Sequence, residues 1–187
     1  MDHHLDLRLR PDPEFAANQL LSALYGKFHR ALSQLGREDI GLSFPRAGGR
    51  DGLGDILRLH GSAEALQALQ ATAWHNTLRD HVDIGAVQAV PADCRFRNVR
   101  RVQAKSNPER LRRRLMKRHN LDAATAAARI PDTTRETLSL PYVRLNSSST
   151  GQPFLLFIAH GPVQEQPVAG RFNSYGLSQE ATVPWFD

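Results

Sequence analysis

Over the first 90 residues the hydrophobic pattern changes between the period of two of a strand and the three- to four-residue period of a helix. The order of these changes restricts the fold. Leucines alternate with polar residues over 5–10, a period of two that predicts a half-buried strand. Apolar residues recur at three- and four-residue steps over 14–35, which predicts an amphipathic helix ended by Gly36. Alternation returns over 40–44 and 56–60, which predicts two more strands.

A second helix and a weaker strand complete the pattern. Ser62 is a suitable N-cap for a helix with Leu66 and Leu69 on its apolar side, and a weak strand is expected within 81–90. The resulting order, β-α-β-β-α-β, is typical of the ferredoxin-like sandwich that RNA-recognition domains also use. We therefore expect an α+β fold whose first domain, residues 1–94, is ferredoxin-like.

The positive charge of the chain is concentrated in residues 95–119. The whole chain has 24 Lys and Arg against 19 Asp and Glu, a net charge of +5. Residues 95–119 hold eleven basic side chains and one acid, Glu109, so this stretch carries +10 and the rest of the chain −5. Such an asymmetry predicts a polyanionic partner, and 21 of the basic residues are arginine, whose planar fork suits phosphates.

The composition changes after Pro91, so we place a domain boundary at Cys94 and expect a C-terminal α+β domain over 95–187. Ser106, with a proline and Glu109 shortly after it, is typical of a helix start. The other elements expected here are an extended run over 96–105, helices over 108–119 and 121–130, and strands over 140–145, 154–160 and 171–176.

The helix expected over 108–119 is rich in arginine and two-sided. Leu111 and Leu115 share one stripe, and basic residues occupy a broad arc beside it. Holding these charges together costs repulsion that phosphates would remove, so we expect a helix that binds nucleic acid rather than a solvated surface. A lipid-binding helix is the main rival, but the apolar side lacks Trp and Phe and is narrow.

Several classes of protein do not fit the composition. At 41% hydrophobic residues the chain can bury a core, and its single cysteine excludes a disulfide scaffold and a cysteine-rich zinc site. The eight histidines show no zinc-binding spacing, so we expect neither a metal nor a cofactor. The absence of a signal peptide and of an apolar run of membrane length predicts a soluble, cytoplasmic protein without a membrane partner.

RNA fits the sequence better than DNA. Leucine-zipper heptads and zinc-finger spacings are both missing, and no recognition-helix pair is evident. The strands over 40–44 and 56–60 lack the aromatic residues on which ordinary RNA-recognition domains stack bases. The first sheet is therefore not expected to be the main binding surface.

Residues 101–116, with the sequence RVQAKSNPERLRRRLM, resemble the signature of the repeat-processing endoribonuclease of type I-F CRISPR systems, the Csy-type enzyme that matures CRISPR RNA. The resemblance runs in order along nearly the whole chain and is loosest over 46–93. Further matching segments are 3–6, 8–15, 26–29, 149–152, 157–162, 175–178 and 183–186.

The resemblance implies a metal-independent, hairpin-specific endoribonuclease. Such an enzyme cuts precursor CRISPR RNA at the 3′ base of the repeat stem-loop by 2′-OH attack and leaves a 2′,3′-cyclic phosphate. It then stays on the mature CRISPR RNA with the other subunits of the type I-F effector complex. We expect the isolated chain to be a monomer.

The resemblance also implies the site. His29 is expected to be the general base, Ser147 to position the attacking 2′-OH, and Tyr175 to support both. Arg101 and Gln103 are expected to read base edges near the bottom of the stem. The other RNA-binding residues that it implies are Phe154, which would stack on the closing pair, and Arg110, Arg113, Arg114, Lys117, Arg118, His119, Ser149 and Thr150.

The implied chemistry is coherent in itself. A histidine is the natural base near neutral pH, and a serine hydroxyl can fix a ribose by hydrogen bonding. The nucleophile already lies on the substrate, so a metal is not required, and DNA, which lacks the 2′-OH, is not cut.

Two departures leave alternatives open. Lys117 stands in a run where the family favours arginine, and a lysine loses bidentate geometry. Ser148 and Ser149 offer hydroxyls next to Ser147, so any of the three could position the 2′-OH. Without the resemblance, the arginine-rich stretch fits a non-catalytic RNA-binding module equally well, and a DNA-binding regulator is a third hypothesis.

Overall fold

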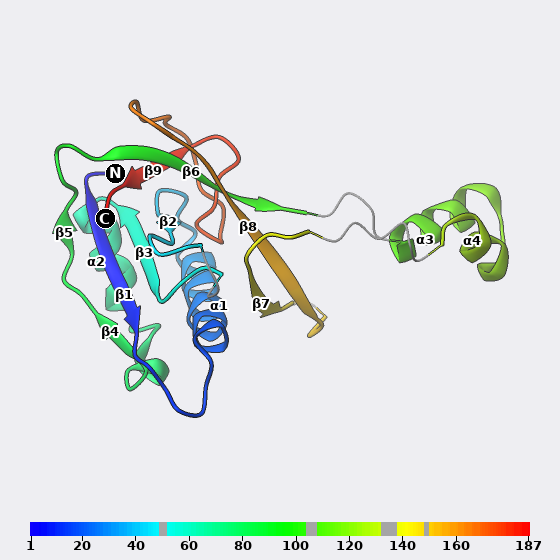
Figure 1. Ribbon diagram of the computed structural model, residues 1–187, viewed down its shortest axis with the longest axis horizontal. Helices are drawn as coiled ribbons and strands as arrows, with labels where there is room; N and C mark the ends of the chain where they lie inside the picture. The colour runs from blue at the N-terminus through cyan, green and yellow to red at the C-terminus, as the bar shows by residue number, and fades with distance from the viewer. Residues whose placement is uncertain (49–51, 104–107, 132–137, 148–149) are drawn as a thin grey trace. The chain divides into compact units, whose positions relative to one another are not determined.

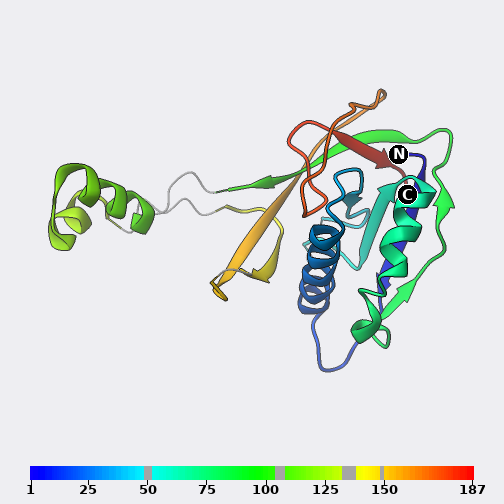
Figure 2. The same cartoon turned by 180° about the vertical axis from the view of Figure 1, so that it is seen from behind.

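A computed structural model of the chain describes residues 1–48, 52–103, 108–131, 138–147 and 150–187. It divides into two compact units: residues 1–101 with 140–187, and residues 102–139. The first unit contains two antiparallel sheets with two helices, so the expected α+β class is confirmed (Figures 1 and 2). The domain boundary expected at residue 94 stays a prediction, because both sheets belong to one compact unit.

The first sheet has the strand order β2-β3-β1-β4, and β5 extends the pairing along β1. Its neighbours are antiparallel, with His4 opposite His60 and Leu7 opposite Leu57 across β1 and β3. The bounds are β1 (His3–Leu9), β2 (Gly41–Ser43), β3 (Ile56–Gly61), β4 (Val82–Ile84) and β5 (Gln88–Ala89).

Two helices pack beside this sheet. They are α1 (Ala17–Leu35) and α2 (Ala63–Ala71), followed by the short 3₁₀ helix η2 (Asn76–Leu78). Ser62 caps α2 as expected, because its side chain accepts a hydrogen bond from the Ala65 N–H. The first helix begins later than expected, because the Asp12 carboxylate accepts the N–H groups of Glu14 and Phe15 in a turn.

The core of the first unit lies between the first sheet and these helices. Leu5, Leu7 and Leu59 are completely buried, as are Leu24 and Phe28 on the facing side of α1. The expected period-two and helical patterns thus place their apolar residues on facing surfaces.

The second sheet has the order β7-β8-β6-β9. It consists of β6 (Arg95–Val102), β7 (Tyr142–Asn146), β8 (Pro153–Gln164) and β9 (Thr182–Trp185). β7 packs on α1 by its alternate buried residues Val143 and Leu145, and its other side chains are exposed.

The strand expected over 171–176 is wrong. The Asn173 side chain accepts the N–H groups of Tyr175 and Leu177, and Gly176 adopts a positive φ of 69°, so the segment is a turn. The last strand of the sheet is instead β9, which contains Pro184. In the part of the chain that the structure describes, β9 is an edge strand that pairs with β6. The Thr182 N–H donates to the Val168 carbonyl instead of to β6, so the nitrogen of Pro184, two residues on, also points away from β6 and its missing N–H costs no ladder bond.

The second unit contains α3 (Pro108–His119) and α4 (Ala123–Arg129). Asp122 caps α4 through the Thr125 N–H, and the Arg112 guanidinium donates to the Ile130 carbonyl at 2.7 Å. Leu111 and Leu115 are half-buried between these elements. The Ser106 cap expected for α3 lies outside the described residues.

Among the described residues, no helix is long and apolar enough to cross a membrane.

Candidate active site

His29 occupies the border between the buried and exposed sides of α1. Phe28 before it is fully buried, whereas Arg30 after it is exposed, so the imidazole reaches the surface beside the apolar stripe. Its Nδ1 lies 2.8 Å from the carbonyl oxygen of Ser174. A carbonyl can only accept, so Nδ1 carries the hydrogen, and in neutral imidazole Nε2 is then the atom with a lone pair available for a proton.

The ring of Tyr175 fixes the plane of that imidazole. The two rings are stacked with centroids 3.8 Å apart and an interplanar angle of 9°. Tyr175 is itself held by the buried Tyr25, whose hydroxyl donates to the Tyr175 carbonyl at 2.8 Å. Burial raises the pKa of Tyr25 well above its ordinary value, so this hydroxyl stays protonated as a donor.

Gly176 keeps the tyrosine-bearing turn against the core. Its φ of 69° favours glycine, and a Cβ there would lie only 3.0 Å from Phe28 and 3.1 Å from Leu42. The turn therefore depends on a residue without a side chain at this position.

Ser147 lies at the end of β7, where the chain turns back toward β8. Its N–H donates to the Gln152 carbonyl at 2.9 Å, and its carbonyl accepts the Gly151 N–H at 2.8 Å. Its hydroxyl oxygen also accepts the Thr150 N–H at 3.3 Å. These bonds hold the serine in a fixed position at the hairpin end.

Arg101, at the end of β6, extends over two aromatic rings. Its guanidinium carbon lies 5.8 Å from the centre of the Phe154 ring and 5.9 Å from that of Tyr175. Cation–π contact at this range orients a cation without neutralising it. The guanidinium thus keeps its charge for a ligand.

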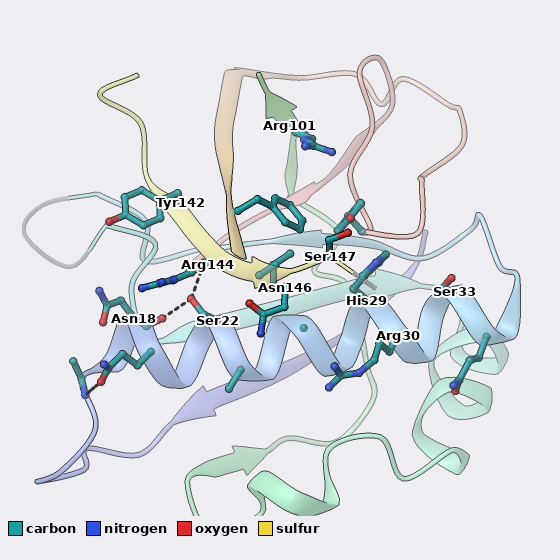
Figure 3. Close-up of a pocket in the computed structure, with 18 residues that line it drawn as sticks. Asn18, Ser22, His29, Arg30, Ser33, Arg101, Tyr142, Arg144, Asn146 and Ser147 are labelled. Carbon is teal, nitrogen blue, oxygen red and sulfur yellow. Dashed lines mark hydrogen bonds between the residues drawn. The ribbon is translucent and has the colours of Figure 1, made fainter. Parts of the chain in front are cut away.

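These side chains line one groove of about 1390 Å³ in the first unit. Figure 3 shows His29, Ser147 and Arg101 around it, with α1 along one side. The lining residues are Ala16, Asn18, Gln19, Ser22, Ala23, Gly26, His29, Arg30, Ser33, Gln34, Arg101, Tyr142, Arg144, Leu145, Asn146, Ser147, Phe154 and Tyr175. None of them is acidic and three are arginines, so the groove favours a negatively charged ligand.

The structure therefore brings five of the expected site residues to one groove: His29, Ser147, Tyr175, Arg101 and Phe154. Their roles stay predictions. Gln103 and Thr150 are exposed and do not line the groove, and Ser149 lies outside the described residues.

The remaining expected RNA-binding residues all lie on α3 in the second unit. Arg110, Arg113, Arg114, Lys117, Arg118 and His119 are exposed there. Glu109 is the one acid of this helix. The exposed side of α3 is thus a dense array of positive charge.

The sequence reasoning missed the polar half of the groove. Asn18, Ser22, Gly26, Arg30 and Gln34 follow one another at steps of four along α1, and all of them line it. Residues four apart share one face of a helix, so small and polar residues at this step, next to the apolar stripe, were the available signal.

Among the described residues, no group of three or more His, Cys, Asp and Glu side chains is arranged to hold a metal ion.

Comparisons with known proteins identify a family. Residues 4–186 match the family model described as CRISPR-associated protein (Cas_Csy4). Two curated relatives are both named CRISPR-associated endonuclease Cas6/Csy4. The one from Pseudomonas aeruginosa (strain UCBPP-PA14) is 55% identical over 187 residues, and the one from Escherichia coli (strain UTI89 / UPEC) is 46% identical over 186; each match covers 100% of both chains. A solved structure titled "An RAMP protein binding different RNA substrates" covers 98% of this chain and 99% of its own, with 11% identity and a TM-score of 0.34.

Proposed function

The chain belongs to the Cas_Csy4 family of CRISPR-associated endonucleases, and from that membership we propose that it cuts precursor CRISPR RNA at the 3′ base of the repeat hairpin. As an endoribonuclease it would use the 2′-OH next to the scissile phosphate as nucleophile and need no metal. The products would be a hairpin that ends in a 2′,3′-cyclic phosphate and a flank with a 5′-OH.

The position of His29 is the observation that carries this proposal. With Nδ1 committed to the Ser174 carbonyl and the ring stacked on Tyr175, Nε2 is the basic atom at a groove without carboxylates. It takes the proton of the 2′-OH, the 2′ oxygen attacks phosphorus, and the bond from phosphorus to the 5′ oxygen breaks. The leaving 5′ oxygen takes up a proton from water, and the hydroxide that remains takes the proton from His29, which restores the neutral imidazole.

Ser147 is proposed to hold the attacking ribose. It lines the same groove as His29, and its backbone is bonded on both sides within the hairpin turn, which supports a positioning role. Ser149 and Thr150 would bind RNA next to it, and Ser148 and Ser149 remain alternatives for the positioning hydroxyl.

Arg101 and Phe154 are proposed to meet the bottom of the stem. A ring under the closing base pair and a guanidinium beside it would stop the duplex at the groove and leave the next phosphate at His29. Gln103 would read a base edge from the segment that follows β6.

The array on α3 is proposed to bind the phosphates of the stem. Its exposed basic residues, Arg110, Arg113, Arg114, Lys117, Arg118 and His119, would supply most of the salt-dependent affinity. The major groove of regular A-form RNA is too narrow for side-chain reading, so a short stem with an open end is the expected target.

The first sheet, with α1 and α2, is proposed to be a ferredoxin-like domain over residues 1–94 that carries the catalytic histidine. The strand order β2-β3-β1-β4, with a helix after β1 and another after β3, supports it. Residues 95–187 would form the RNA-binding domain. In the cytoplasm the enzyme would stay on its product as a subunit of the type I-F effector complex.

The test is cleavage of the repeat hairpin of its own CRISPR array in EDTA. We expect a single cut with a cyclic phosphate end, and a single 2′-deoxy nucleotide 5′ of the cut should stop cleavage and spare binding. Dependence on Mg²⁺, or cleavage of the 2′-deoxy substrate, would contradict the mechanism. A bound but intact hairpin would instead favour a non-catalytic RNA-binding module, and tighter binding of duplex DNA at equal salt a DNA-binding regulator.

A further inference from the structure

The segment that orients His29 is itself fastened to β6. Residues 173–181 run from the turn that carries Ser174 and Tyr175 to the residue before β9. Near its first end this segment meets α1, through the bond from the His29 Nδ1 to the Ser174 carbonyl. Its last four residues meet β6, a strand that the proposed cleavage chemistry uses only at Arg101.

Asn98 makes the side-chain contacts at the β6 end. Its Nδ2 donates to the Ser178 carbonyl at 3.1 Å and to the Ala181 carbonyl at 2.8 Å. The Ser178 N–H donates in turn to the Val99 carbonyl at 3.1 Å, so the residue next to Asn98 binds the same turn through its backbone. One amide group therefore bridges both ends of the turn over 178–181, here called the Ser178 turn, and fastens it to β6.

The two carbonyls alone orient the Asn98 amide. In the described part of the chain, its Oδ1 is buried and has no hydrogen-bond partner. Carbonyl oxygens only accept, so the NH₂ side of the amide faces them and the two sides of the amide cannot exchange places. A buried oxygen without a partner lowers stability, so stability alone does not explain an asparagine at this position.

The Ser178 turn continues directly from the turn that carries Tyr175. The Asn173 N–H donates to the Leu177 carbonyl at 2.9 Å, which closes the first turn one residue before Ser178. Leu177 is 1% exposed and Ser178 is 8% exposed, so the junction between the two turns is packed into the core. A packed junction transmits strain, so a shift of Ser178 is passed to the turn that carries Tyr175.

We propose that Asn98 is a positioning residue for RNA cleavage, which acts on His29 by fastening the Ser178 turn to β6. The inference rests on the proposed function and deepens it. Through the turn, Asn98 keeps the Ser174 carbonyl and the Tyr175 ring against the imidazole. Without the amide, the imidazole would sample other tautomers and ring planes, so Nε2 would face the attacking hydroxyl in fewer molecules. RNA binding would not change, because Asn98 does not line the groove.

The experiment compares two substitutions at Asn98 with the wild-type chain. Asn98→Asp keeps the size of the side chain but turns an oxygen toward the two carbonyls, and Asn98→Ala removes the amide. In both variants the single-turnover rate of hairpin cleavage should fall about fivefold or more, whereas the dissociation constant of a 2′-deoxy hairpin should stay within about twofold. Imidazole ¹⁵N spectra of the free protein should change from one His29 tautomer, with its hydrogen on Nδ1, to a mixture.

Two further variants complete the design. Ser178→Ala removes the hydroxyl that accepts the N–H groups of Glu180 and Ala181, so it loosens the same turn without a change in β6. It should slow cleavage and alter the His29 spectrum in the same direction, which keeps the inference testable if an Asn98 variant does not fold. Asn76→Ala, at an exposed asparagine of η2, is the matched control and should behave as wild type.

Wild-type cleavage rates in the Asn98 variants, or slower cleavage with an unchanged His29 spectrum, would overturn the inference. Rate and affinity that fall together would do the same, because they would indicate a general loss of structure. The spectra are recorded without RNA, so these results differ from failure of the proposed function, in which the wild-type chain itself would leave the hairpin uncut.

Discussion

The imidazole of His29 lies flat on the phenol ring of Tyr175, with ring centroids 3.8 Å apart and planes only 9° from parallel. The two residues are far apart in sequence, and the contact joins the middle of α1 to the turn before β9. Together with the bond from Nδ1 to the Ser174 carbonyl, it fixes both the plane and the tautomer of the histidine. We expect the orientation of this ring to set the rate of cleavage.

Replacing Tyr175 tests whether the ring or the hydroxyl is needed. Tyr175→Phe keeps the stack, so its single-turnover cleavage rate should stay within about threefold of wild type, whereas Tyr175→Ala should lose about tenfold or more. The RNA dissociation constant should not change in either variant, because a positioning residue acts on the chemical step. An equal loss in both variants would mean that the hydroxyl itself takes part.

Gly176→Ala should disturb the same contact through the backbone. A Cβ at this left-handed position would crowd Phe28 and Leu42, so unfolding free energy should fall by about 2–3 kcal/mol and cleavage should slow. Gly36→Ala is the matched control, because Gly36 has a similar φ of 64° with nothing within 4 Å. It should cost only about 1 kcal/mol and spare cleavage, as measured by denaturant titration and single-turnover assays. Equal costs would show that crowding at Gly176 is unimportant.

Stability should fall as the solution becomes mildly acidic. Burial lowers the pKa of His160 from 6.5 to about 4, and burial also lowers the pKa of His60 well below its usual value. At a pH between the lowered pKa of each histidine and its usual pKa of 6.5, the unfolded chain binds a proton that the folded chain does not bind. Acid therefore favours unfolding.

The loss from His160 alone should approach about 2–3 kcal/mol between about pH 7 and about pH 4.5, as measured by urea denaturation. The unfolding free energy of His160→Leu should depend less steeply on pH. The His160 ring packs beside Phe44 and Trp185, and a leucine in its place binds no proton. An unchanged slope in that variant would assign the effect to other groups.

The ion pair between the buried Arg58 and the half-buried Asp6 should contribute strongly to stability. Arg58 is 7% exposed, donates to both Asp6 carboxylate oxygens at 2.7 and 2.9 Å, and also holds the Phe186 carbonyl near the C-terminus. Asp6→Asn leaves that cation buried without its counter-charge and should cost about 3 kcal/mol in denaturant titrations. Asp80→Asn breaks only an exposed contact to Arg79 and should change stability by less than about 0.5 kcal/mol, so equal losses would rule out a special role for burial.

Local signals predicted the helices and the first sheet well. The bounds of α3 were found because a proline and Glu109 stand in its first turn, and the end of α1 because Gly36 allows a left-handed cap. The error over 171–176 arose because alternation there hid the turn made by Asn173. β9 was missed because Pro184 argues against a strand unless the strand is known to lie at an edge.

Local sequence patterns could not predict which residues come together in the site. His29, Ser147 and Tyr175 lie in three separate segments, and only the packing of β7 on α1 and the turn at Gly176 brings them to one groove. The resemblance to a family supplied these residues by position, whereas the row of residues at steps of four along α1 that lines the groove could have been recognised from the sequence.

The most direct test of the account is the single-turnover cleavage rate of His29→Ala at RNA concentrations that saturate binding, with His3→Ala, at a histidine outside the groove, as control. If Nε2 of His29 is the general base, cleavage should slow by about 100-fold to 10,000-fold while the dissociation constant of the repeat hairpin stays at the wild-type value. Cleavage at the wild-type rate with saturated RNA would contradict the account.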